Sequence, residues 1–274
     1  MTQDFSQYIQ PGRVHRRLYS DPEIFEMEMQ RIFGRAWVYI GHESQVKNPG
    51  DYFATQIGRK AVVMVRDNDG TIHVVHNQCA HRGAMVVATE KGNAPEFTCC
   101  YHGWTYHLDG KLKAVPLNHG YPRDFDPSNP KTSMRRVPRV KSYRGFVFLN
   151  FDADAMSLTQ YLGPAREYID LVLDQSPSGR MEIIQGSQDY DIGANWKLLV
   201  ENSFDDYHLL TTHATWLDYM KNAGVEMKRL VSDFEQRLIA RALERAGGNK
   251  RLAADLLRVK RTTLIEKLKR LDRA

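Results

Sequence analysis

The alternation of apolar and polar positions between about residues 37 and 151 is typical of short β-strands. Runs of β-branched and aromatic residues, among them AVVMV, TIHVVH and FVFLNF, are separated by polar stretches. Two of these stretches contain an Asp-Gly pair, Asp69-Gly70 and Asp109-Gly110, which favours a tight hairpin turn. We therefore predict a small all-β domain over residues 37–151.

The flanking residues have the spacing of helices. Ahead of the β region, Asp21 and Pro22 precede apolar positions three and four apart, which predicts a capped helix in an N-terminal segment, residues 1–36. Residues 152–228 combine an amphipathic segment, the strand-like MEIIQGSQDYDI and the helical WKLLVENSFDDYHLL, a pattern that predicts the start of an α+β domain. Residues 229–274 are helical throughout, in three short segments. The chain should be multi-domain.

Charge separates the last segment from the rest of the chain. The formal net charge is +5. Residues 229–274 hold thirteen Lys and Arg against six Asp and Glu, a net of +7, which leaves −2 for residues 1–228. A basic segment after a nearly neutral body suggests a polyanionic partner, although such runs are often solvated faces.

The three cysteines, Cys79, Cys99 and Cys100, lie close together in the sequence and beside histidines. This favours metal ligation in a reducing compartment over a disulfide framework. The first residues show no apolar core of a secretory signal, and no run reaches the eighteen apolar residues of a membrane span. We therefore expect a cytoplasmic protein that does not enter the membrane.

Cysteine and histidine occur together in two short arms. Cys79-Ala80-His81 is followed, after seventeen residues, by Cys99-Cys100-Tyr101-His102. A Rieske [2Fe-2S] centre needs two cysteines on one iron and two histidines on the other, which two facing arms of this kind supply. A Cys2His2 zinc site would use the same atoms, but zinc sites usually pair like ligands within an arm.

The residues around these arms, NQCAHRGA and CCYHGWTY, resemble the Rieske domain of the α subunits of aromatic-ring-hydroxylating oxygenases. The resemblance implies a cluster bound by Cys79, His81, Cys99 and His102, and reduced by a ferredoxin or a flavin reductase. It also implies that Arg82, Gly83, Gly103 and Trp104 shape the two loops. Cys100 departs from the family pattern, and the C-x-x-H spacing favours Cys99 as the ligand.

A second group of polar residues follows in the α+β region. Residues three apart on a helix share a face, so Asp205 can lie beside His208. Five residues turn a helix by about 140°, which would point His213 elsewhere. The helix is therefore predicted to end or distort near Thr211-Thr212. Taken alone, the two histidines could also be surface residues near a helix end.

With Asn195-Trp196-Lys197 upstream, the run ENSFDDYH resembles the mononuclear iron motif of the same oxygenase family. The resemblance implies that His208 and His213 are ligands of a non-haem Fe(II), and that Asp205 bridges to a Rieske histidine of a neighbouring subunit in a homo-trimer. The third ligand in the family is a carboxylate on a later helix of a helix-grip-like domain. The resemblance ends near residue 226, so the catalytic domain should be truncated and its iron site incomplete.

The C-terminal segment has the pattern of a helix-turn-helix. Ser232 and Glu235 have capping-box spacing ahead of an apolar stripe, and Gly247-Gly248 should end that helix. Asn249 can cap a second helix over residues 250–257, and a third over residues 261–271 should follow. The third helix and the residue before it present polar side chains that could contact DNA phosphates and base edges: Lys260, Arg261, Thr262, Thr263, Lys267, Lys269 and Arg270.

The run GGNKRLAADLLRVKRTTLIEKLKRL resembles the Fis-type DNA-binding domain that ends bacterial enhancer-binding regulators, with Arg258 as a departure in the turn. The resemblance implies a dimer on duplex DNA, with Phe234, Leu238 and Ala242 against the partner copy. Basic amphipathic helices that pack on the oxygenase part are the alternative.

These observations predict four segments: an N-terminal helical segment (1–36), an all-β Rieske domain (37–151), a truncated α+β catalytic domain (152–228) and an all-α helix-turn-helix (229–274). The favoured function is a Rieske electron-transfer component of a ring-hydroxylating oxygenase fused to a DNA-binding module. Three alternatives stay open: a working dioxygenase, a redox-responsive DNA-binding regulator, and a non-natural or misassembled chimera. The aromatic substrate is not readable from the sequence.

Overall fold

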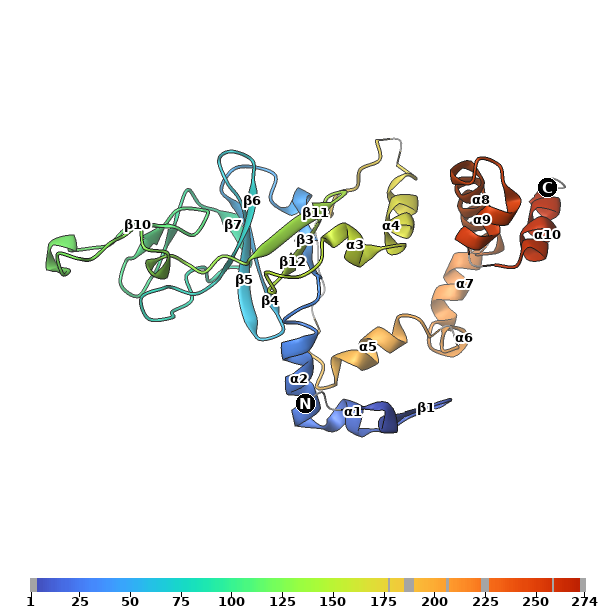
Figure 1. The fold of residues 1–274 in the computed structure, drawn as a ribbon, viewed down its shortest axis with the longest axis horizontal. Helices are drawn as coiled ribbons and strands as arrows, with labels where there is room; N and C mark the ends of the chain where they lie inside the picture. Colours follow the sequence, from blue (N-terminus) through green and yellow to red (C-terminus); the bar gives the residue numbers. More distant parts are fainter. Residues whose placement is uncertain are drawn as a thin grey trace. The chain divides into compact units, whose positions relative to one another are not determined.

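The computed structural model describes residues 4–176, 178–184, 190–205, 207–222, 227–257 and 259–271. The chain divides into two compact units, residues 1–193 and 194–274, which are described separately (Figure 1). No helix among the described residues is long and apolar enough to cross a membrane.

The first unit begins with a short hairpin and two helices. Strands β1 (Ile9–Gln10) and β2 (Arg13–Val14) pair antiparallel, and helices α1 (Arg17–Ser20) and α2 (Pro22–Arg31) follow. The capped helix predicted from Asp21 and Pro22 is confirmed, because the Asp21 carboxylate accepts the Glu23 N–H at 3.0 Å and Pro22 is the first helical residue.

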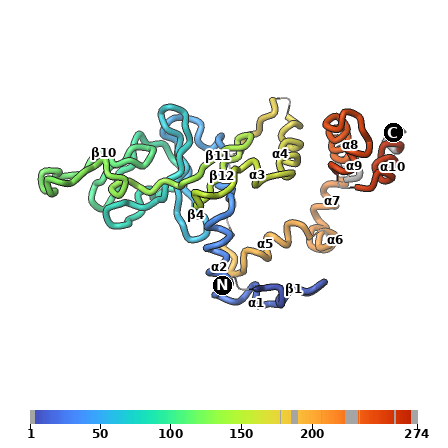
Figure 2. Tube along the Cα trace, in the orientation of Figure 1, coloured from blue at the N-terminus to red at the C-terminus, as the bar shows by residue number. Residues whose placement is uncertain are grey.

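Three antiparallel sheets follow in the blue-to-green part of the trace (Figure 2). Both Asp-Gly pairs lie at turns between antiparallel strands, as predicted, and Gly70 and Gly110 have φ of 83° and 86°. One sheet has the order β6 (Ile72–His76), β5 (Lys60–Arg66), β4 (Asp51–Ile57), β7 (Lys91–Asn93). Another has the order β11 (Arg139–Tyr143), β12 (Phe146–Asn150), β3 (Val38–His42). The smallest has the order β10 (Leu112–Ala114), β9 (Thr105–Tyr106), β8 (Phe97–Thr98).

Two apolar clusters stabilise these sheets. One is centred on Val62, Met64, Val147 and Leu149 of β5 and β12, all with at most 1% of their surface exposed. The other surrounds the two Cys/His arms and includes both of the buried cysteines, together with Val63, Val65, Val75, Phe97, Trp104, Tyr106, Leu108 and Met134. The arms are therefore anchored in the core of the unit.

After β12 every regular element in the described chain is a helix. Helix α3 (Leu158–Leu162) begins with a capping box between Ser157 and Gln160, and α4 (Ala165–Leu173) follows. The predicted strand-like segment at 181–192 has no strand in its described residues, and residues 185–189 lie outside them. Ile184 is 84% exposed there, and no strand in the described chain pairs with this backbone.

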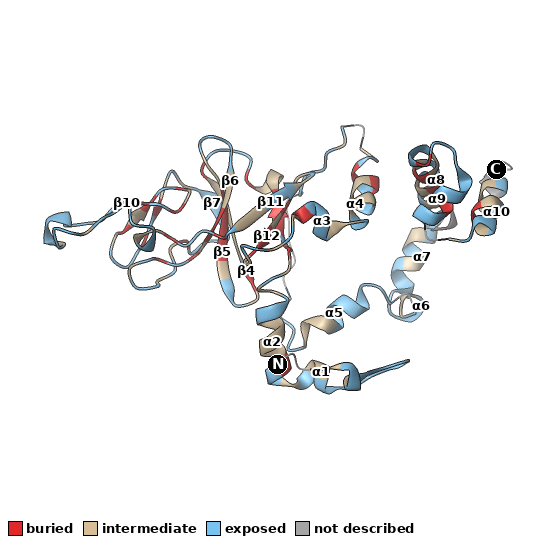
Figure 3. Ribbon diagram, viewed as in Figure 1, coloured by how far each residue is buried: buried red, intermediate tan, exposed pale blue. Residues whose placement is uncertain are grey.

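The second unit is helical. Its first three helices, α5 (Trp196–Asn202), α6 (Leu209–Thr212) and α7 (Ala214–Asn222), have no buried residue, as Figure 3 shows. Helices α8 (Met227–Arg245), α9 (Lys250–Leu256) and α10 (Arg261–Leu271) enclose a small core. That core consists of Ile239, Ala242, Ala246, Ala253, Ala254 and Leu264.

Two of the three boundary signals in this bundle were predicted correctly. Gly247 and Gly248 end α8 with positive φ, and the Gly248 N–H donates to Leu243 C=O at 2.8 Å. The Asn249 side chain caps α9 by accepting two backbone N–H groups. The capping box at Ser232 was wrong, because α8 already begins at Met227 and Ser232 lies inside the helix.

Candidate functional site

The two Cys/His arms have the same backbone hydrogen bonds. In the first arm, residues 79–84, the Cys79 N–H donates to Ala84 C=O at 2.8 Å and the Gly83 N–H donates to Cys79 C=O at 2.9 Å. In the second arm, residues 99–104, Cys99 donates to Trp104 and accepts from Gly103 at the same two distances. Gly83 and Gly103 both have positive φ, 75° and 68°, so each arm turns at its glycine. Each arm therefore presents its cysteine and histidine from the same kind of tight loop.

The cysteines differ sharply in burial. Cys79 and Cys99 are 3% and 2% exposed, whereas Cys100 is exposed. Each arm therefore contains one buried thiol. The geometry therefore sets Cys99 apart from Cys100, in agreement with the spacing in the sequence.

The histidines of the two arms face each other. The rings of His81 and His102 have centroids 4.6 Å apart. The Nδ1 atom of His81 is buried and has no hydrogen-bond partner in the described chain. Burial lowers the pKa of His81, and the nearby His102 and Arg82 lower it further. A neutral imidazole with an unpartnered nitrogen is the form that binds a metal, so the donor set fits a cluster with thiolates on one iron and imidazoles on the other.

Two residues of the second arm and its hairpin contact the first arm. The Trp104 ring stacks on His81, with centroids 5.0 Å apart and planes within 6°. The Tyr106 hydroxyl lies 3.0 Å from Cys79 Sγ and accepts the Ala80 N–H at 3.1 Å. Burial, reinforced by the Cys79 contact, raises the pKa of Tyr106, so its hydroxyl stays protonated and donates to the sulfur. Sequence reasoning assigned no role to Tyr106, although it is the last residue of the run CCYHGWTY.

The second predicted site brings three side chains together in the second unit. The Asp205 carboxylate lies 3.2 Å from His208 Nδ1, and the His208 and His213 rings have centroids 5.2 Å apart. Asp205 lies between α5 and α6 and not on a regular helix, so the expected shared helical face was wrong although the contact exists. The predicted break near Thr211-Thr212 is confirmed, because α6 ends at Thr212 and His213 leaves the helical conformation.

The described residues do not complete a metal site around these histidines. No group of three or more His, Cys, Asp or Glu side chains in the described part of the chain is placed to hold one metal ion. His208 is partly exposed and His213 is exposed. The two histidines thus stand at the two ends of α6 and are accessible to solvent.

The residues predicted to contact DNA differ in their exposure to solvent. Lys260, Arg261, Thr262 and Lys269 are exposed, whereas Thr263 and Lys267 are partly buried. Lys267 forms an ion pair with Glu235 of α8, which ties α10 to the first helix of the bundle. The side chain of Arg270 lies outside the described ones.

The apolar stripe predicted for a partner copy is divided in the structure. Ala242 is 7% exposed and packs in the core of the bundle, so its assignment to a dimer interface was wrong. Phe234 is 38% exposed. Sequence periodicity identifies an apolar face but not what covers it.

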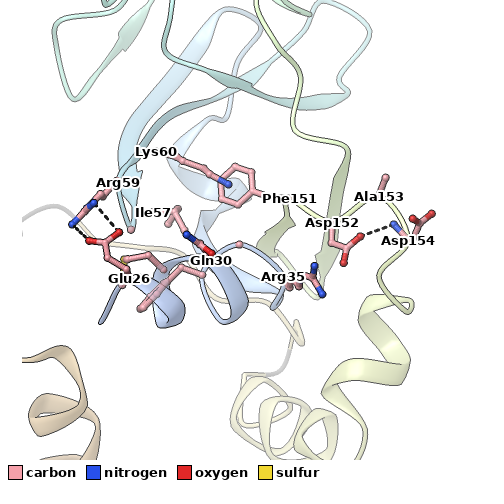
Figure 4. Close-up of a pocket in the computed structure, with 14 residues that line it drawn as sticks. Glu26, Gln30, Arg35, Ile57, Arg59, Lys60, Phe151, Asp152, Ala153 and Asp154 are labelled. Atoms are coloured by element: carbon pink, nitrogen blue, oxygen red, sulfur yellow. Dashed lines mark hydrogen bonds and ion pairs between the residues drawn. The ribbon is translucent and has the colours of Figure 1, made fainter. Parts of the chain in front are cut away.

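A cleft of about 610 Å³ lies elsewhere in the first unit, between α2, the β4–β5 turn and the end of β12 (Figure 4). In this cleft Arg59 forms an ion pair with Glu26, and Lys60 Nζ lies 3.9 Å from the centroid of the Phe151 ring. Neither the Cys/His arms, the run ENSFDDYH nor the C-terminal helices contribute to it.

Comparison with known families defines three parts of the chain. Residues 36–143 match the Rieske [2Fe-2S] domain, and residues 184–235 match the catalytic domain of ring-hydroxylating α subunits. Residues 230–271 match the Fis family of bacterial regulatory proteins. The resemblances seen in the sequence are thereby confirmed, as are the two expected cofactors, a Rieske [2Fe-2S] cluster and mononuclear Fe(II). The catalytic-domain match runs beyond the end expected near residue 226 and overlaps the Fis match inside α8.

Individual relatives are dioxygenase α subunits. The chain is 41% identical over 211 residues to the anthranilate 1,2-dioxygenase large subunit of Acinetobacter baylyi, which covers 77% of this chain and 44% of that protein. It is 42% identical over 206 residues to the biphenyl dioxygenase α subunit of Paraburkholderia xenovorans, with 73% and 45% covered. The chain therefore spans less than half the length of these relatives.

A solved structure of naphthalene 1,2-dioxygenase from Rhodococcus sp. superposes with a TM-score of 0.70 at 38% identity, over 75% of this chain and 46% of that one. A quaternary ammonium Rieske monooxygenase in complex with L-carnitine gives a TM-score of 0.67 at 29% identity, over 74% and 56%. About three quarters of the chain thus has the Rieske oxygenase fold.

Proposed function

We propose that the chain is a one-electron carrier whose [2Fe-2S] cluster is held by Cys79, His81, Cys99 and His102. The observation that supports this most is the pair of equivalent arms, each with a buried thiol and an imidazole facing that of the other arm. When bound, the cluster would supply reversible one-electron chemistry at a potential of about −150 to +300 mV. The test is to reduce the purified chain and record the low-average-g electron paramagnetic resonance (EPR) signal of a His-ligated cluster; a colourless zinc protein would refute the proposal.

The surface beside the first arm fits an acidic electron donor. A cavity of about 920 Å³ there is lined by His81 and by basic side chains. Its only carboxylate among the lining residues, Asp109, is paired with Lys111 at 2.9 Å. Such a basic surface favours encounter with an acidic partner, and a ferredoxin or flavin reductase is the proposed donor. The basic lining residues are Arg82, Lys111, Lys131, Arg135 and Arg136.

Tyr106→Phe is expected to lower the reduction potential of this centre. A hydrogen bond to a cysteine sulfur stabilises the more negative, reduced state, so its loss favours oxidation. A net hydrogen bond is worth about 0.5–1.5 kcal/mol, which for one electron corresponds to roughly 20–65 mV. Spectroelectrochemical titration of the variant and the wild type measures the shift. An unchanged potential would show that the Tyr106 contact does not tune the centre.

We further propose that the chain alone does not hydroxylate aromatic compounds. Among the described residues no carboxylate completes a 2-His-1-carboxylate site with these two histidines, so iron bound at His208 and His213 should be held weakly. With a competent reductase and a panel of aromatic substrates, neither product nor coupled oxygen uptake is expected. Product formation that is lost in His208→Ala would overturn this and support a working dioxygenase. We also propose that the chain forms a homo-trimer in which Asp205 faces a Rieske histidine of the neighbouring subunit. Measurement of the molecular mass in solution tests the trimer.

A second proposed function is binding of duplex DNA by the last three helices, favoured by the Fis-family match over residues 230–271. In a redox-responsive regulator, the oxidation state of the cluster would change the affinity of these helices for DNA. A difference in DNA affinity between the oxidised and the reduced chain would support this function. A misassembled chimera is the remaining alternative. Sequencing the natural gene across codons 220–235 tests it, because an uninterrupted oxygenase frame there would expose the tail as an artefact.

A further inference from the structure

The two arms are alike at their tips but are held differently below them. In the second arm, Phe97 of β8 pairs with Tyr106 of the antiparallel strand β9. Phe97 stands two residues before Cys99, and Tyr106 stands two residues after Trp104. The equivalent positions in the first arm are Asn77 and Val86. Residues 77–87 are all described, and none of them is in a strand. The first arm therefore needs another connection at this level.

The Asn77 side chain supplies that connection. Its Oδ1 accepts the N–H groups of Val86 at 3.1 Å and Val87 at 2.9 Å, and its Nδ2 donates to Val87 C=O at 2.7 Å. Its own backbone N–H donates to Ala61 C=O of β5 at 2.9 Å. Asn77 is 7% exposed, so these hydrogen bonds are shielded from water. In the protein interior hydrogen bonds are stronger than in water, and the loss of one partner costs more.

We infer that Asn77 is a positioning residue for the metal centre. Its side chain replaces the strand pair that the second arm has, and so holds Cys79 and His81 in register with Cys99 and His102. Asn77 touches none of the four proposed ligands by its side chain and acts by closing the loop that carries two of them. This inference rests on the proposed function, in which those four residues bind the cluster.

Asn150 offers a matched control in the same unit. It is 1% exposed, its Nδ2 donates to Arg35 C=O at 2.7 Å, and its Oδ1 accepts the Asp152 N–H at 2.8 Å. It lies at the end of β12 and in neither arm. Asn150→Ala should therefore cost thermal stability much as Asn77→Ala does, without loosening an arm.

The test compares iron release and spectra in the full chain. At a temperature well below both unfolding midpoints, Asn77→Ala is expected to release iron to a ferrous chelator about tenfold faster than wild type, which corresponds to roughly 1.4 kcal/mol on the barrier. Its reduced EPR signal should also broaden or shift. Asn150→Ala should keep the wild-type rate and signal. Asn77→Asp keeps the two accepted bonds but sets a carboxylate oxygen against the Val87 C=O in place of the donated bond, so it should also release iron faster than wild type. It provides a second measurement if Asn77→Ala does not fold.

Wild-type release and an unchanged signal in the Asn77 variants would overturn the inference. So would equal acceleration in Asn150→Ala, because the effect would then be one of general stability. A wild-type chain without a cluster would refute the proposed function itself, and is distinguished from these outcomes before any variant is made.

Discussion

Replacing Cys99 with serine is expected to leave the chain colourless and without the low-average-g signal, whereas Cys100→Ser should keep both. Cys99 is buried, and its backbone makes the two hydrogen bonds that shape the second arm. Serine offers a harder oxygen in place of the thiolate that iron-sulfur clusters require. Cys100 is exposed, so it is not one of the two buried thiols.

Iron and sulfide content, visible absorption and EPR of the two variants measure this outcome. The two cysteines are sequence neighbours, which makes Cys100→Ser a close control for expression and for loss of a thiol. Cluster loss in Cys100→Ser alone would show that the ligand assignment is wrong. Circular dichroism of Cys99→Ser checks that the β-sheets still form.

Arg261→Ala in the full chain is expected to weaken binding to a preferred duplex by about 1–3 kcal/mol, and to affect other sequences less. Arg261 is the first residue of α10 and is exposed, where recognition helices contact base edges. Lys269→Ala should instead weaken binding to all sequences and reduce the salt slope by about one, because a phosphate contact releases a counterion.

Gel-shift titrations at several salt concentrations separate these two effects. Lys267→Ala is the matched control, since Lys267 is paired with Glu235 and should contribute to the stability of the bundle more than to DNA affinity. A dimer on a pseudo-palindromic site is expected. Absence of binding at low salt, or a strictly monomeric chain, would leave the basic helices as a solvated surface.

The local features of the chain were predictable from the sequence. The Cys/His arms are specified by spacing within a few residues, and the caps at Asp21 and Asn249 by the residue at the helix start. The contacts between the arms were not predictable in this way. Trp104 on His81 and Tyr106 on Cys79 join residues more than twenty positions apart, and only the folded sheets bring them together.

The wrong predictions concern local sequence patterns that are compatible with more than one structural environment. Ser232 and Glu235 have capping-box spacing, but the preceding residues continue the helix and the signal has no effect there. Ala242 belongs to an apolar stripe that the bundle's own core covers. The strand-like residues near Ile184 have no partner strand among the described residues, and a strand without a neighbour leaves its backbone groups unpaired.

Helix α8 runs without interruption through residues 230–235, where the two family matches overlap. Proteases cleave chain segments that can open locally, and the interior of a hydrogen-bonded helix resists them. A nick where the two family matches overlap is therefore disfavoured. A fragment released by cleavage ahead of α8 would thus contain residues of both family matches.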